Sequence, residues 1–179
     1  MSSPCDPKYA PAGDVGTALL MVDSRLKAVY DGKSSGTDPE GQRLVEDFIA
    51  SLGPTEVEDV VDGTCTLIYM FMQWLRLAYE DHDRDVIEYV VPSFVASLRM
   101  MPKSVRPEAI PTMAGLVIAA GTGLSPSLWR RQYGEWSADE MNALEATALL
   151  LAEHINRLTD DHDFAARMIS EALSGAHRD

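Results

Sequence analysis

The chain has 179 residues, of which 46% are hydrophobic and 24% charged, and its formal net charge is −13 at pH 7. These proportions are typical of one globular domain, large enough to fold without disulfide or metal cross-links. No apolar stretch approaches the roughly 20 residues of a membrane span, no secretory signal precedes the domain, and the negative charge disfavours binding to nucleic acid. Two isolated cysteines, Cys5 and Cys65, suit a reducing compartment, so we expect a soluble cytoplasmic protein.

Helical periodicity runs through nearly the whole chain, and no segment alternates like a half-buried strand, so we predict an all-α fold. Residues 1–13 are predicted to form a flexible tail, residues 14–175 a single multi-helix domain, and residues 176–179 a C-terminal tail. The first helix is expected over 14–30. Its predicted buried residues are Leu19, Leu20, Leu26 and Val29. A second helix is expected over 38–53, with Asp38 as the N-cap and Pro39 at the first helical position.

A long helix over residues 55–80 is predicted to lie at the centre of the bundle. Thr55 and Glu58 are spaced as a capping box at its start. Its middle part is apolar on every side, which is typical of a helix surrounded by others. The side chains that give this apolar character are Cys65, Leu67, Tyr69, Met70, Phe71, Met72 and Trp74.

Four more helices are expected over 83–101, 112–120, 125–134 and 163–173, with a kink or break at Pro92. Another begins at a second capping box, formed by Ser137 and Glu140. Its apolar residues recur at helical spacing and predict a continuous packing face; they are Met141, Leu144, Ala148, Leu151, Ile155 and Leu158. The sequence thus predicts about seven or eight helices around the 55–80 helix.

Two similar acidic turns follow the two longest predicted helices, at residues 80–83 and 160–163. Carboxylates suit Mg²⁺ or Mn²⁺ and histidine suits Zn²⁺ or Fe²⁺, so the turns together could hold a divalent metal in a helical enzyme. The second turn resembles the aspartate-rich motifs of isoprenoid-processing enzymes, and both contain the His-Asp dipeptide of helical metal phosphohydrolases. The candidate ligands are Asp81, His82, Asp83, Asp161, His162 and Asp163. We favour the alternative that these residues cap helix ends.

Residues 115–133 resemble the centre of a bacterial helix-turn-helix regulator, because Ala119, Gly123 and Leu124 have compatible spacings. The resemblance implies that Ser127, Arg130 and Arg131 project outward to contact DNA. Residues 89–134 contain five basic residues and one acid, so this part carries +4 while the rest of the chain carries −17. A buried helix, a glycine turn and a proline-started helix would produce the same pattern in any helical bundle.

A third pattern concentrates aromatic and basic side chains on one short predicted helix. They are Trp129, Arg130, Arg131 and Tyr133. Tryptophan, tyrosine and arginine dominate the energetics of protein–protein interfaces, so this helix is a candidate partner-binding surface. The alternative is that Trp129 belongs to the core.

No nucleophile elbow, phosphate-binding loop or cofactor motif is present, and we recognise no family across the whole chain. We therefore expect a non-enzymatic interaction or regulatory module that acts through protein contacts and carries no cofactor. The opposed charges of its two parts also favour self-association. A DNA-binding regulator and a metal-dependent enzyme are the two alternatives.

Overall fold

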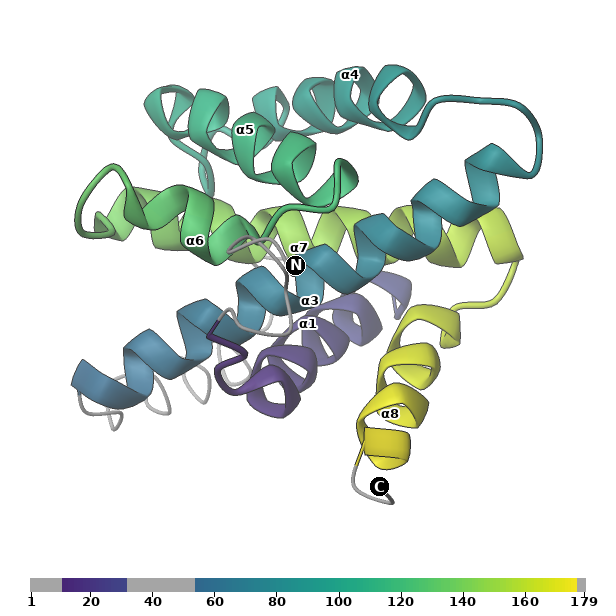
Figure 1. Ribbon diagram of the computed structural model, residues 1–179, viewed down its shortest axis with the longest axis horizontal. Helices are drawn as coiled ribbons and strands as arrows, with labels where there is room; N and C mark the ends of the chain where they lie inside the picture. The colour runs from purple at the N-terminus through teal and green to yellow at the C-terminus, as the bar shows by residue number, and fades with distance from the viewer. Residues whose placement is uncertain (1–10, 32–53, 177–179) are drawn as a thin grey trace, which may run out of the picture.

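The fold was determined from a computed structural model, and the description covers residues 11–31 and 54–176 (Figure 1). These residues contain seven α-helices, one short 3₁₀ helix and no strand, which confirms the all-α prediction for this part of the chain. In chain order the helices are α1 (Val15–Tyr30), α3 (Pro54–Glu80), α4 (Val86–Arg99), η2 (Pro107–Ala109), α5 (Ile110–Gly121), α6 (Pro126–Arg131), α7 (Ala138–Thr159) and α8 (Phe164–Ala176). The helix predicted over 38–53 and most of the two predicted tails lie outside the described residues.

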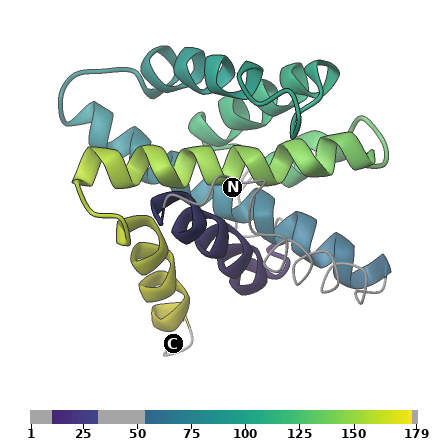
Figure 2. The same cartoon turned by 180° about the vertical axis from the view of Figure 1, so that it is seen from behind.

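The helices form a bundle built on a crossed pair, α3 and α7, which contact each other along the middle of the molecule. Helices α4 and α5 cover one side of this pair, and α1 and α8 cover the other (Figures 1 and 2). Helix α6 packs against α5 and α3 near the start of α7. Within the described residues, no helix is both long enough and apolar enough to cross a membrane.

The prediction that residues 55–80 form the central helix is confirmed. Helix α3 contacts α1, α4, α5, α6, α7 and α8. Six of its side chains are completely buried: Cys65, Leu67, Ile68, Phe71, Met72 and Leu75. Full burial of one large apolar side chain contributes about 1.5–3 kcal/mol, so this helix contributes strongly to the stability of the core.

Local signals locate most helix ends correctly. Ser137 and Glu140 form the expected capping box at the start of α7, with both reciprocal hydrogen bonds present. Helix α3, however, begins at Pro54, so Thr55 lies inside the first turn and is not its N-cap. Helix α4 continues through Pro92, which is exposed, so the helix does not break there. The kink, the other expectation at Pro92, stays a prediction.

Helix α1 meets α3 at a close backbone contact. Asp14 caps α1 by accepting a hydrogen bond from the Thr17 amide, and its own amide donates to the Asp59 carbonyl on α3. A Cβ at Gly63 would overlap the Asp14 backbone, so only glycine permits this approach.

Two of the residues predicted to be buried on α1 are exposed. Leu20 is 71% exposed and Val29 is 45% exposed. The buried stripe follows Val15, Ala18, Leu19, Val22 and Leu26. Each helical residue turns the side chain by about 100°, so Leu20 leaves the face on which its neighbour Leu19 is buried.

Candidate functional site

The short helix α6 and the turn that follows it carry the residues that the sequence singled out for partner or DNA binding. Ser125 caps it by accepting a hydrogen bond from the Leu128 amide, and Pro126 occupies its first position. Pro126, Ser127 and Arg130 face inward, whereas the following segment through Tyr133 is exposed. The helix therefore divides the candidate residues between the interior and the surface.

Arg130 is a structural residue with 3% exposure. Its guanidinium donates to both carboxylate oxygens of Glu140 on α7, at 2.7 and 2.8 Å, and to the carbonyls of Gly134 and Glu135. It also lies 4.9 Å from the centre of the Trp136 ring. These bonds from Arg130, followed by the Ser137 amide, hold the pKa of Glu140 below its usual value. All of these contacts fasten α6 to the loop that leads into α7.

Ser127 and Arg131 converge on Asp62, a nearly buried carboxylate of α3. The Ser127 hydroxyl donates to Asp62 Oδ1 at 2.6 Å, and Arg131 Nη2 lies 3.0 Å from Oδ2. Ser127 is 3% exposed. The expectation that Ser127, Arg130 and Arg131 all project outward is therefore wrong for the first two, because their polar atoms are used inside the protein. A DNA-reading helix would need them free.

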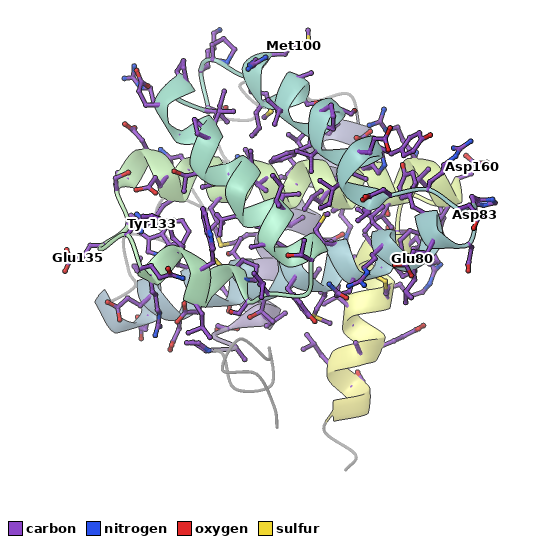
Figure 3. All side chains as sticks on the ribbon, turned by 45° about the horizontal axis from the view of Figure 1, so that its top comes forward. Glu80, Asp83, Met100, Tyr133, Glu135 and Asp160 are labelled. Atoms are coloured by element: carbon purple, nitrogen blue, oxygen red, sulfur yellow. The ribbon has the colours of Figure 1, made fainter. Side chains whose placement is uncertain are left out.

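Trp129 and Tyr133 are the two aromatic candidates, and both reach the surface. Their rings are in contact, with centroids 5.2 Å apart, and Tyr133 is 66% exposed. One edge of the Trp129 indole rests on Gly115 of α5, where any Cβ would overlap the ring. Trp129 is thus half-buried and anchored, while Tyr133 extends from the end of the molecule, next to Glu135 (Figure 3).

These two aromatic residues line an open depression of about 530 Å³ between α6, η2, the first turn of α5 and the start of α7. Its other lining residues are Glu108, Ala109, Pro111, Thr112, Arg130, Ser137, Asp139 and Glu140. The lining contains both apolar and polar groups. A concave surface with exposed aromatic rings is suited to receive a side chain of a partner.

The structure does not join the two acidic turns into a metal site. Both lie at the same end of the molecule, as the labelled Asp83 and Asp160 show (Figure 3). Yet no group of three histidine, cysteine or acidic side chains among residues 11–31 and 54–176 is arranged to hold a metal ion. Asp161 instead pairs with Arg167, and this pair lowers the pKa of Asp161. The His162 ring stacks on the Tyr30 ring, with the two ring centres 3.9 Å apart.

The remaining candidate ligands stay at the helix ends. Asp81, His82 and Asp83 are exposed in the turn after α3, and Asp163 is exposed at the start of α8. The N-cap of α4 is Asp85, which accepts a hydrogen bond from Ile87 N and is not one of the candidate residues. In the second turn Asp161 accepts a hydrogen bond from Asp163 N, just before α8 begins. A metal-dependent reaction at these turns has no support in the described residues.

Three residues of this region were not identified from the sequence: Asp62, Glu108 and Asp139. Asp62 lies 65 residues before its partner Ser127, so no local pattern could connect them. Glu108 and Asp139 look like ordinary first-turn acids, which favour helix N-termini. Gly115 carried a usable signal, since a glycine within an apolar helix often marks a close approach.

The fold class of this protein does not determine its function. An all-helical bundle supports many unrelated activities, and the bundle described above is defined by general packing rules. Comparisons of the chain with protein-family models, with curated proteins and with solved structures found no match.

Proposed function

We propose that this protein is an interaction module that binds a partner protein through the depression beside α6. The observation that carries the proposal is the contacting pair Trp129 and Tyr133, of which Tyr133 is 66% exposed at the edge of a depression of about 530 Å³. Large aromatic side chains at the centre of an interface supply much of its binding free energy. An exposed aromatic ring beside a concave surface is therefore a suitable anchor.

The rigidity of the surrounding structure supports the same proposal. Trp129 is held against Gly115, and Arg130 fastens the segment after α6 to Glu140 through two hydrogen bonds. A pre-organised surface loses less conformational entropy when a partner binds. The Trp129 ring is therefore already positioned beside the depression before any partner binds.

The test is affinity purification of the full chain from its native host, with quantitative mass spectrometry of wild type and a Tyr133→Ala variant. We expect the variant to recover the specific partner at least about tenfold less, the effect of losing about 1.4 kcal/mol at a hot spot. Tyr89→Ala is the matched control, because Tyr89 is an exposed tyrosine (47%) on α4, outside the depression. Equal recovery of every partner by wild type and Tyr133→Ala would refute the proposal.

A further inference from the structure

The charge of the depression is opposite to that expected from the sequence of α6. Arg130 and Glu140 line it together and neutralise each other through their 2.7 Å ion pair. Glu108 and Asp139, the other charged lining residues, are exposed, and their carboxylates make no ion pair within the described residues. The depression therefore carries two uncompensated negative charges.

The nearby basic side chains of Arg131 and Arg106 do not line the depression. Arg131 is engaged by Asp62 at 3.0 Å, on the α3 side of α6, and does not line the depression. Arg106 is exposed at the start of η2 and does not line it either. The formal charge of the whole chain, −13, adds a long-range field that attracts cations.

Aromatic rings beside free carboxylates form a suitable environment for a cationic side chain. The face of a tyrosine or tryptophan ring attracts ammonium and guanidinium groups, and carboxylates pair with the same groups. The protein already contains such contacts, since Arg84 lies 5.2 Å from the Tyr89 ring centre. Tyr133, with two thirds of its surface exposed, is free to form one with a partner.

We propose that the depression binds a basic segment of the partner, with an arginine or lysine side chain inserted between Tyr133 and the carboxylates of Glu108 and Asp139. This inference rests on the proposed function and specifies the chemistry of the partner. The aromatic pair supplies contact area, and the two acids select for positive charge.

The test uses the full chain and a fluorescent peptide of about ten residues in which arginine and glycine alternate. A peptide with citrulline in place of arginine keeps the shape and removes the charge. Binding is measured by fluorescence anisotropy at about 20 mM salt, where exposed charges are weakly screened. The signal of the Trp129 indole N–H, followed by nuclear magnetic resonance, reports whether the peptide occupies the depression.

The key variant is Glu108→Gln with Asp139→Asn. Its matched control is Glu58→Gln with Glu88→Gln, which removes two exposed acids near the starts of α3 and α4 and changes the net charge equally. We expect the key variant to weaken binding about three- to tenfold and the control to change it less than about twofold. The wild type should move the Trp129 signal with the arginine peptide and not with the citrulline peptide.

Three results would overturn the inference: no binding by the wild type, equal losses in both double variants, or shifts of Trp129 that depend only on protein concentration. The last result would identify a second copy of this chain as the occupant. The proposed function fails separately, when Tyr133→Ala leaves capture of the native partner intact. If Tyr133→Ala abolishes capture and the loss of Glu108 and Asp139 does not weaken it, the interaction module stands and the basic partner is wrong.

Discussion

Arg130 on α6 and Glu140 on α7 form a two-point ion pair, with Nε 2.7 Å from Oε2 and Nη2 2.8 Å from Oε1. The side chain of Arg130 is 4% exposed and that of Glu140 is 17% exposed. Glu140 Oε1 also accepts a hydrogen bond from the Ser137 amide, so the capping box of α7 and the ion pair share one carboxylate. The start of α7 and the position of α6 are therefore coupled.

Replacing Arg130 with alanine should destabilise the protein strongly. The variant leaves Glu140 and two loop carbonyls without their donor, and breaking a buried pair typically costs about 3–5 kcal/mol. Urea unfolding monitored by circular dichroism gives the change in unfolding free energy. Arg157→Ala is the control: its side chain is 67% exposed, and its pair with Glu153 should contribute less than about 0.5 kcal/mol. Similar losses in both variants would contradict the structural role of Arg130.

Asn156 should be essential for the docking of α8. It is 1% exposed, donates to the Tyr30 hydroxyl and the His162 carbonyl, and accepts from the Ala165 amide. Asn156→Ala should cost about 2–4 kcal/mol, because several buried polar groups lose their partner. Amide hydrogen exchange should then increase in α8 more than in α3. Asn142→Ala, on the exposed side of the same helix, should leave exchange unchanged.

Gly63→Ala should destabilise the protein although alanine favours helix. The new Cβ would overlap the Asp14 backbone and force α1 away from α3. Overpacking of this kind costs about 1–3 kcal/mol, more than the helix-propensity gain of about 1 kcal/mol. Thermal unfolding should compare the Gly63 variant with Gly16→Ala on α1, where the new Cβ would lie 3.7 Å from the nearest atom. Unchanged stability of the Gly63 variant would show that this contact is not tight.

His154 should make the protein less stable in mild acid. Burial, followed by the charge of Arg157, lowers its pKa below 6.5, and Tyr79 Oη lies 3.0 Å from its Nε2. The unfolded chain then binds the proton more readily than the folded one, so stability decreases as pH falls below about 6.5. Urea midpoints at several pH values between about 5 and 8 should fall less for His154→Gln than for wild type. Parallel profiles would contradict the lowered pKa.

Glu145 should make the protein less stable as pH rises, which is the opposite of the effect of His154. Burial raises its pKa, although Arg25 Nε lies 2.8 Å from Oε1 and partly opposes the shift. The same oxygen has no hydrogen-bond partner, so the ion pair is close but poorly aligned. The folded state then binds a proton more tightly than the unfolded state, and stability decreases as pH rises above about 4.5.

Glu145→Gln removes this titration and directly tests whether the pKa of Glu145 is raised. Between about pH 5 and pH 8, the unfolding free energy of the variant should fall less, or rise more, than that of wild type. Glu153→Gln, a partly exposed acid on the same helix, is a control for the loss of one charge. If the unfolding free energy of the Glu145 variant fell more than that of wild type over this pH range, the result would contradict a raised pKa of Glu145.

Most of the helical architecture could be predicted from the sequence because its signals act over short distances. Apolar residues at 3.6-residue spacing and caps such as Ser137 depend on neighbours within one or two turns. The central position of α3 followed from the same pattern, since a helix that is apolar on every side needs partners on every side. Which side of α1 is buried was predicted less well, as the exposed Leu20 shows.

The character of the candidate site was decided by the tertiary structure. Arg130 pairs with Glu140 across a loop, and Arg131 pairs with Asp62, which lies 69 residues earlier. Because both arginines of α6 are paired, the surface beside this helix is acidic and not basic. Charge in a sequence is a property of single residues, whereas surface charge is what remains after buried partners have cancelled one another. These ion pairs form only when α3, α6 and α7 pack together, and no local sequence pattern predicts that packing.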